Sequence, residues 1–241
     1  MSTSMRRLAI LAGLMFVAAC DVGAGTPSPA KDGAGPFPAA DRPVARIVSS
    51  RWSTEEARDR LNEADEVMDK AGIKPGMTVA DIGAGEGYYT IRLAERVGKE
   101  GRVLAEDIVP EVRDSLAERV VRERLQSVSV RLGEPADPKL PENSFDRVLM
   151  VHMYHEIEQP YEFLWRMRPA LKADGLVIVV DANRPTQNHG TPPKLLKCEF
   201  AAVGYVQVAT SDMPSAGGYV ASFRAQGPRP DPRAIKACTE D

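Results

Sequence analysis

The chain lacks an excess of positive charge. It has 31 Lys and Arg residues against 34 Asp and Glu residues, for a formal net charge of −3. The first twenty residues contribute two arginines and no acid, so the remaining balance is 29 basic to 34 acidic side chains, or −5. A nucleic-acid-binding surface needs a concentrated basic face. The composition therefore argues against a nucleic-acid partner.

The N-terminal apolar run is too short to cross a bilayer. It covers the twelve residues from Leu8 to Ala19, whereas a membrane-spanning helix needs about 20. Arg6 and Arg7 precede the run and Cys20 follows it. A short apolar segment behind basic residues is typical of an export signal.

The four residues before and including Cys20, VAAC, resemble the lipobox of bacterial lipoproteins. The resemblance implies that Cys20 is acylated and anchors the chain to a membrane of the bacterial cell envelope, with a periplasmic domain. Two alternatives remain open: a cleaved secretory signal with an incidental cysteine, or a start site placed too far upstream.

Cysteines are scarce, and after Cys20 the chain has Cys198 and Cys238. In an oxidising compartment the two could form one disulfide that holds the C-terminal tail. Two unpaired thiols, one of them in a helix, are the other possibility.

Residues 21–45 are rich in Gly, Ala and Pro and show neither a helical nor a strand period. Such a segment cannot bury enough apolar surface to fold, which predicts a flexible spacer. The length and composition of the rest predict one globular domain. The expected organisation is a signal peptide at 1–19, a tether at 20–45, a domain at 46–226 and a tail at 227–241.

Strand and helix patterns alternate through the predicted domain. An amphipathic helix, in a stretch that starts at Ser53 with a capping residue, comes first, and an apolar strand ends in the sequence VADIG. Further strands are expected at 103–108, 127–132, 145–152 and 176–182, with helices at 110–125, 161–171 and 192–203. This alternation predicts parallel βαβ units. Two final strands joined by Pro214 to Gly217 predict an antiparallel hairpin. The fold class is thus an α/β three-layer, Rossmann-like sandwich, with a seven-stranded, mostly parallel sheet and a C-terminal antiparallel hairpin.

The loop after the first predicted strand carries Gly83, Gly85 and Gly87, directly behind Asp81. In a parallel sheet, ligands lie beyond the carboxyl ends of the strands, where glycine lets the backbone approach them closely. The spacing is G-x-G-x-G, not the G-x-G-x-x-G of dinucleotide-binding folds. That spacing and the terminal hairpin disfavour a nicotinamide dehydrogenase. An acid in this position suits a ligand that bears an ammonium and a sulfonium.

These features resemble the class I S-adenosylmethionine-dependent methyltransferases over roughly residues 73–224. The segment DIGAGEG resembles the family's first motif, and FDRVLMVHMYHEI and LKADGLVIVVD resemble its fourth and fifth strands. The resemblance implies S-adenosyl-L-methionine as cofactor. It places Asp107 on the ribose, where a carboxylate can accept from two hydroxyls, and Glu134 or Asp137 near the adenine. The glycine loop with Asp81 would hold the rest of the cofactor, and Tyr88 would line the cofactor or acceptor pocket.

All three histidines of the chain follow predicted strand ends. His152 and His155 come after the fourth strand and His189 after the fifth. A near-neutral pKa is typical of histidine, so each is a candidate catalytic base. They could also bind a metal together with Glu156, but no close ligand spacing favours it, and no metal is predicted.

The expected function is methyl transfer to a small or lipophilic, envelope-associated acceptor. The alternative is a non-catalytic envelope lipoprotein that keeps the fold as a binding or scaffold domain. The alternative arises because S-adenosylmethionine is made in the cytoplasm, whereas the signal would place the domain outside. The glycines and Asp107 favour retained cofactor binding.

Overall fold

The computed structural model describes residues 35–47 and 54–240. The expected export signal and Cys20 lie outside the described residues. Within the two described ranges, no helix is both long and apolar enough to cross a membrane.

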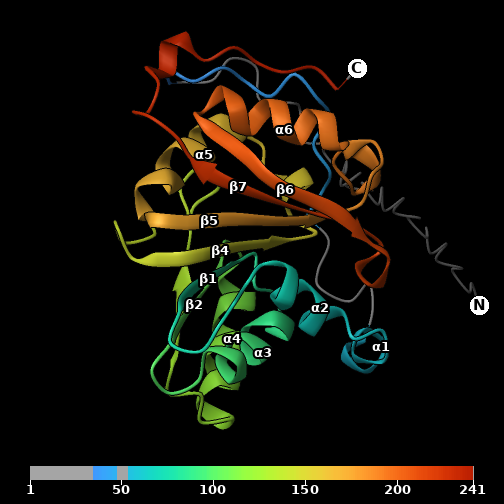
Figure 1. Ribbon diagram of the computed structural model, residues 1–241, viewed down its shortest axis with the longest axis vertical. Helices are drawn as coiled ribbons and strands as arrows, with labels where there is room; N and C mark the ends of the chain where they lie inside the picture. Colours follow the sequence, from blue (N-terminus) through green and yellow to red (C-terminus); the bar gives the residue numbers. More distant parts are fainter. Residues whose placement is uncertain (1–34, 48–53, 241) are drawn as a thin grey trace, which may run out of the picture. The chain divides into compact units, whose positions relative to one another are not determined.

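The fold is a single seven-stranded sheet covered on both faces by helices (Figure 1). The strand order is β3-β2-β1-β4-β5-β7-β6, with β1 to β5 parallel and β7 antiparallel to both of its neighbours. The strands are β1 (Thr78–Ile82), β2 (Arg102–Asp107), β3 (Val128–Leu132), β4 (Phe145–Val151), β5 (Leu171–Asp181), β6 (Tyr205–Met213) and β7 (Gly218–Ala225). The predicted three-layer sandwich with its terminal hairpin is confirmed.

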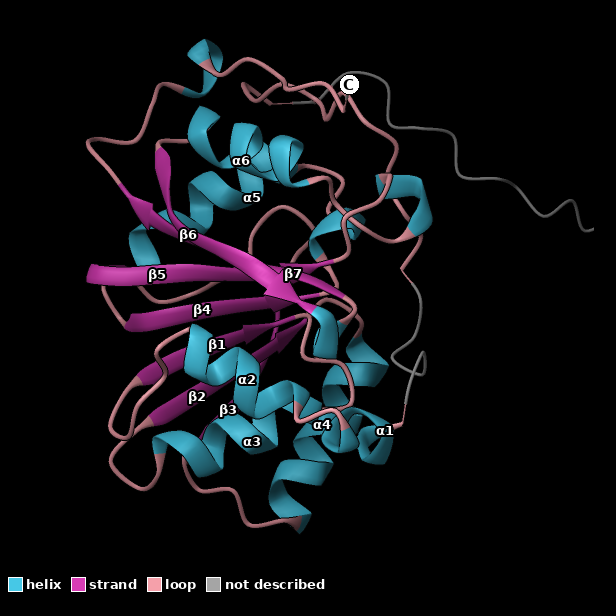
Figure 2. Ribbon diagram, turned by 45° about the vertical axis from the view of Figure 1, so that its right-hand side comes forward, coloured by secondary structure: helices cyan, strands magenta, loops and turns pink. Residues whose placement is uncertain are grey.

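Helices α2 to α4 cover one face of the sheet, and α5 and α6 cover the other (Figure 2). The helices are α1 (Glu55–Arg60), α2 (Glu63–Lys70), α3 (Tyr88–Val97), α4 (Pro110–Arg122), α5 (Pro160–Met167) and α6 (Pro193–Ala202). The central strands are buried on both sides, as a run of apolar residues in a parallel sheet predicts. On the α6 face, Phe200 stacks on Phe223 of β7 with ring centroids 3.9 Å apart.

The first helical segment differs from the prediction. One helix starting at Ser53 was expected, but the structure has two short helices, separated at Asn62, whose backbone is left-handed with φ of 55°. The cap of α1 is Thr54, whose side chain accepts a hydrogen bond from the backbone N–H of Ala57. The break lets α1 and α2 follow different directions over α3.

The last residues of the segment predicted as a tether contact the domain. Arg42 and Ala45 are 8% and 6% exposed, so the chain packs on the domain before residue 46. The Arg42 guanidinium donates to a carboxylate oxygen of Glu199 on α6 at 3.0 Å and to the Ile157 carbonyl at 3.3 Å. The backbone N–H of Ala45 donates to the carbonyl of His155 at 3.1 Å. This arm therefore braces the loop that carries His155.

The two cysteines that the sequence left either paired or free are joined in a disulfide. Cys198 lies on α6, and Cys238 lies in the C-terminal tail, 40 residues later. The bond fixes the tail against α6, where Cys238 is 5% exposed.

We expect the double variant Cys198→Ala/Cys238→Ala to lose about 3 to 5 kcal/mol of unfolding free energy, because the cross-link restricts the unfolded chain. Urea unfolding followed by circular dichroism measures the loss. Wild-type protein unfolded with a reductant should match the double variant. An unfolding midpoint unchanged by either treatment would contradict the expected contribution.

Candidate functional site

The glycine loop lies at the carboxyl end of β1 and leads directly into α3. Gly83, Gly85 and Gly87 all have left-handed backbones, with φ of 66°, 56° and 92°. A Cβ on Gly87 would lie 2.5 Å from Leu116 of α4, and one on Gly83 would lie 3.1 Å from Met153. Glycine adopts a left-handed φ at little cost, and because it has no Cβ, neighbouring groups can approach its backbone closely. The loop lies at the carboxyl end of the strand, where the sequence predicted it. Gly83 is exposed, Gly85 is half-buried and Gly87 is buried.

Asp107 connects the glycine loop to the start of α4 through two hydrogen bonds. It closes β2, and its carboxylate accepts hydrogen bonds from the backbone N–H groups of Gly85, at 3.0 Å, and Val109, at 2.9 Å. A carboxylate has about four lone-pair sites. Two of them remain for ligand hydroxyls even with both of these bonds in place.

Asp81 at the end of β1 is buried and accepts a hydrogen bond from the Thr90 hydroxyl at 2.6 Å. Burial raises the pKa of the Asp81 carboxyl to about 6, even though the Thr90 bond acts in the opposite direction. The nearby carboxyl of Asp107 adds to the rise. The charge of Arg58 acts in the opposite direction, but the effect of burial is larger.

Glu106 joins the same acidic cluster, and the sequence analysis missed it. It is 1% exposed, and its Oε1 atom has no hydrogen-bond partner among the described residues. Burial, followed by the charge of Asp107, raises the pKa of Glu106 to about 8. The position of Gly133 makes room for it, since a Cβ there would lie 1.5 Å from Glu106 Oε1. The sequence shows Glu106 directly before Asp107 at the end of a predicted strand. The alternation of side chains along a strand does not show that both carboxyls are buried.

Glu134 and Asp137, predicted near the adenine, face each other across a short backbone turn after β3. The ammonium of Lys139 lies 3.1 Å from the carboxylate of Glu134 and 3.3 Å from that of Asp137. The loop is therefore held by its own ion pairs. Contact of either acid with an adenine stays a prediction.

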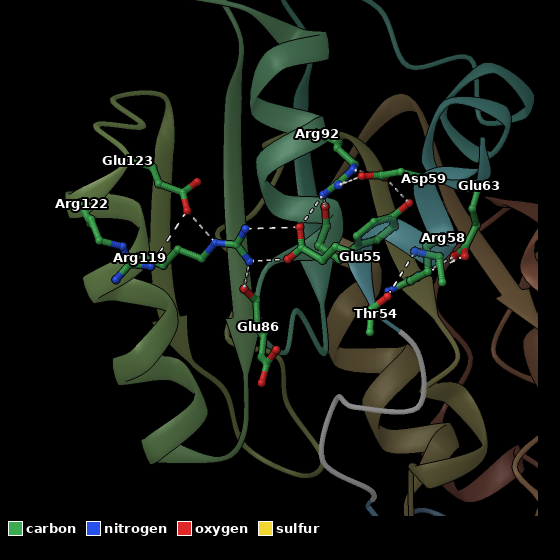
Figure 3. A network of polar contacts seen from close by, with 12 residues as sticks. Thr54, Glu55, Arg58, Asp59, Glu63, Glu86, Arg92, Arg119, Arg122 and Glu123 are labelled. Atoms are coloured by element: carbon green, nitrogen blue, oxygen red, sulfur yellow. Dashed lines mark hydrogen bonds and ion pairs between the residues drawn. The ribbon is translucent and has the colours of Figure 1, made fainter. Parts of the chain in front are cut away.

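Tyr88, predicted to line the pocket, is held between α1 and α3. The guanidinium groups of Arg58 and Arg92 lie 3.7 Å and 3.9 Å from the centroid of its ring. Its hydroxyl donates to Asp59 at 3.0 Å. Figure 3 shows Arg58, Asp59 and Arg92 in the polar network that joins α1 to α3. Tyr88 thus helps to hold α1 against α3. Contact of Tyr88 with a ligand stays a prediction.

Arg119 of α4 connects this network to the glycine loop. Its guanidinium donates to Glu55 of α1 at 2.6 Å and to the backbone carbonyl of Glu86 at 2.8 Å (Figure 3). It also pairs with Glu123 one turn further along α4 at 2.8 Å. No sequence signal marks this link, because the partners of Arg119 lie on three separate elements.

The three histidines gather beyond the ends of β4 and β5. His155 is 2% exposed, and its Nδ1 lies 3.1 Å from both carboxylate oxygens of Asp181, the last residue of β5. His152 Nδ1 lies 3.8 Å from Asp181. The His189 ring packs edge to face against His155, with centroids 5.4 Å apart. The clustering predicted for these histidines is present.

Asp181, which the sequence analysis did not single out, organises the cluster. It is fully buried, and it also accepts from the Thr191 hydroxyl at 2.7 Å. Burial alone would raise the pKa of Asp181, but the nearby His152 and the hydrogen bonds from His155 and Thr191 outweigh burial and hold the pKa well below its usual range. Two of the histidines, His152 and His189, have left-handed backbones. Non-glycine residues in this region are uncommon and cluster at functional sites.

Comparison with known proteins agrees with this geometry. Residues 80–179, which run from β1 to β5, match the family model described as a methyltransferase domain. Over these residues the chain is similar to a methyltransferase domain. The cofactor that this domain implies is S-adenosylmethionine.

Among curated relatives, nocamycin O-methyltransferase of Saccharothrix syringae is 44% identical over 86 residues, which are 35% of this chain and 30% of that protein. Arsenite methyltransferase of Halobacterium salinarum is 28% identical over 136 residues, which are 55% of this chain and 35% of that protein. The chain thus spans about a third of the length of these relatives.

Solved structures share the fold of the methyltransferase domain. An S-adenosylmethionine-dependent methyltransferase from Aquifex aeolicus superposes with a TM-score of 0.61 at 23% identity, covering 71% of this chain and 97% of that one. The [4+2]-cyclase SpnF gives a TM-score of 0.59 at 16% identity, covering 80% and 89%.

The residues of the methyltransferase domain fit the cofactor it implies. Gly83 of the loop is exposed, and Glu106 Oε1 is a buried acceptor with no hydrogen-bond partner among the described residues. Buried carboxyls with raised pKa values favour a cationic ligand, because a nearby positive charge stabilises their ionised form. S-adenosylmethionine carries such charge on its ammonium and sulfonium.

Proposed function

We propose that the protein transfers a methyl group from S-adenosylmethionine to a small or lipophilic acceptor. The observation that carries the proposal is the cluster of Asp81, Glu106 and Asp107 around the glycine cradle. These acids lie at the carboxyl ends of adjacent strands, where parallel sheets bind ligands.

In this proposal Asp107 holds the ribose hydroxyls, and the glycine loop admits the cofactor to the cradle. Asp81 and Glu106 supply negative charge on its cationic side. The bound cofactor supplies an electrophilic methyl group. Since in-line methyl transfer depends mainly on positioning, the protein needs to orient the acceptor and accept a proton where one is released.

The acceptor side is formed by the histidine cluster. Met153 lies against Gly83, and it is flanked in sequence by His152 and followed closely by His155. The two loops are therefore adjacent. Because Asp181 engages His155 Nδ1, the other ring nitrogen, Nε2, is the one that can take a proton from an acceptor.

The second candidate function is a binding or scaffold domain without methyl transfer. One solved structure that shares the fold is named as a [4+2]-cyclase. The fold therefore also occurs in a protein that is named for another activity, and this favours the second candidate. A fold does not by itself determine function. The buried acids with raised pKa values favour cofactor binding over a purely structural role.

We further propose that the domain acts at a membrane of the bacterial envelope, held by acylated Cys20. The Cys198–Cys238 disulfide supports an oxidising compartment such as the periplasm. An envelope location favours an acceptor that is itself in the envelope. Radiolabelled palmitate incorporation in wild type but not in Cys20→Ala would support the anchor, and labelling of neither would refute it.

The test of activity is transfer of labelled methyl groups from S-adenosylmethionine into envelope extracts. His155→Asn should reduce the transfer rate at least tenfold while leaving cofactor affinity within about twofold, because general-base catalysis contributes on the order of 10²–10⁴-fold. Glu158→Gln, an exposed acid in the same loop, is the matched control. Cofactor binding without transfer into any extract fraction would favour the scaffold function.

The acidic cluster predicts a pH dependence of cofactor binding. The pKa of Asp81 is about 6 and that of Glu106 about 8. Both groups gain negative charge as pH rises through this window, so a cationic ligand should bind more tightly at pH 8.5 than at pH 6. We expect about a tenfold gain, equivalent to one pKa unit of coupling. Calorimetry across this range measures it.

Glu106→Gln should remove most of the gain above pH 7, since the amide does not titrate. S-adenosylhomocysteine, which lacks the sulfonium charge, should show a smaller gain with the wild-type protein. An affinity that is flat or that falls with pH would argue against the acidic cluster as the cationic side of the site.

A further inference from the structure

Three metal-binding side chains converge beside the predicted acceptor site. One ligand atom each from His155, Glu156 and His189 lies within 4.8 Å of the other two. Sequence spacing gave no sign of this group, because His189 lies in the loop after β5 whereas the other two follow β4. The parallel strands bring the two loops together at one edge of the sheet.

The hydrogen bonds around His155 resemble those of a metal ligand. Asp181 engages Nδ1 of His155, which leaves Nε2 as the ring nitrogen with a lone pair for a metal. Metal-binding histidines nearly always donate their second ring N–H to a carboxylate or carbonyl, which fixes the tautomer and the ring orientation. Asp181 is itself held by Thr191 and the Ala182 backbone N–H.

His189 gives an independent indication. Its Nδ1 is buried and has no hydrogen-bond partner among the described residues. A buried polar atom without a partner costs about 1 to 3 kcal/mol, and a bound cation would satisfy it. The residue also has a left-handed backbone, with φ of 58°. Arg184 fixes this conformation by donating to the His189 carbonyl at 3.0 Å.

We propose that His155, Glu156 and His189 bind a divalent transition-metal ion, with Asp181 as the positioning residue. Two imidazoles and one carboxylate are a donor set that zinc accepts while keeping a fourth position open. Ligand atoms about 2.1 Å from a tetrahedral ion lie about 3.4 Å from one another. Binding therefore draws the three groups closer by small side-chain rotations.

The open fourth position gives the site a role in acceptor recognition. A metal ion there binds an acceptor through a hydroxyl, thiol or carboxylate and lowers the pKa of the bound group. With the metal bound, His155 Nε2 is a ligand, and this lowered pKa takes the place of proton transfer to His155. The acceptor class this favours is a small molecule with such a group next to the methylated atom. This role rests on the proposed methyl transfer, whereas metal binding itself does not.

The test uses the full chain, stripped with a chelator and titrated with Co²⁺ and Zn²⁺. We expect one Co²⁺ per chain with visible d–d absorption of low-symmetry nitrogen and oxygen coordination, and displacement of Co²⁺ by Zn²⁺. His189→Ala and Glu156→Gln should each weaken Zn²⁺ binding at least tenfold. Asp181→Asn should weaken it about 10- to 100-fold, as for other residues that orient ligands.

Glu158→Gln is the matched control and should bind Zn²⁺ as the wild type does. Thermal unfolding of each variant separates a lost site from a lost fold. No stoichiometric binding by the wild type, or binding that His189→Ala and Glu156→Gln both retain, would overturn the proposal. Because S-adenosylmethionine binding is measured separately on the metal-free chain, failure of the metal site would leave the proposed function standing, and the reverse also holds.

Discussion

Asp107→Ala is expected to weaken S-adenosylmethionine binding at least 100-fold. In the proposed complex, the variant removes the acceptor for two ribose hydroxyls, and each hydrogen bond to a charged group contributes about 1.5 to 3 kcal/mol. It also frees the backbone N–H groups of Gly85 and Val109, which Asp107 now holds. Calorimetry of the variant against the wild type measures the loss.

Two controls separate binding from folding. Asp114→Ala removes an acid from α4, where the Asp114 side chain is 62% exposed, and should leave cofactor affinity unchanged. Asp107→Asn keeps one acceptor oxygen and should fall between the wild type and Asp107→Ala. Equal cofactor affinity in wild type and a folded Asp107→Ala would show that the ribose is held elsewhere, with Glu106 as the next candidate.

Asp181→Ala is expected to lower the free energy of unfolding by about 3 to 5 kcal/mol, the usual cost of breaking a buried charged pair. Three donors lose their acceptor: His155 Nδ1, the Thr191 hydroxyl and the Ala182 backbone N–H. Urea unfolding at pH 7 measures the effect. An exposed acid such as Asp174, replaced by alanine, provides the control.

The same carboxylate predicts how stability depends on pH. Its pKa in the folded protein lies well below the unfolded value of about 4. Its contribution is therefore present above pH 4 and is lost as pH falls towards the folded value. Asp181→Asn should flatten the acid limb of the stability curve. A limb of unchanged slope in Asp181→Asn would contradict this account of acid unfolding.

The sheet was predictable because each strand carries its own local signal. The apolar runs that became β1, β4 and β5 lie between turn residues, and the sequence around Pro214 predicts the hairpin that β6 and β7 form. The glycine cradle was predictable for the same reason, since its three glycines and Asp81 are contiguous.

The features that the sequence did not reveal depend on contacts between distant segments. Arg42 lies in a stretch with the composition of a linker, but it is buried because Glu199, 157 residues away, offers a carboxylate. The break at Asn62 has no proline or glycine to mark it. Glu106 and Asp181 occupy strand ends, and their burial depends on how neighbouring loops close over them.

The histidine cluster was predicted in outline and missed in detail. Placement after strand ends put His155 and His189 at the same edge of the sheet. That the two rings pack together, 5.4 Å apart, depends on the loops that follow β4 and β5. Loop conformation is poorly encoded by periodicity, which is the signal that sequence analysis uses best.

The central claim is that this chain binds S-adenosylmethionine in the cradle formed by Gly83, Gly85, Gly87 and Asp107. Isothermal titration of the purified full chain with S-adenosylmethionine tests it most directly. The account predicts saturable binding of one molecule per chain, competed by S-adenosylhomocysteine and lost in Asp107→Ala. A folded protein that gives no saturable binding at pH 8.5 would contradict the account.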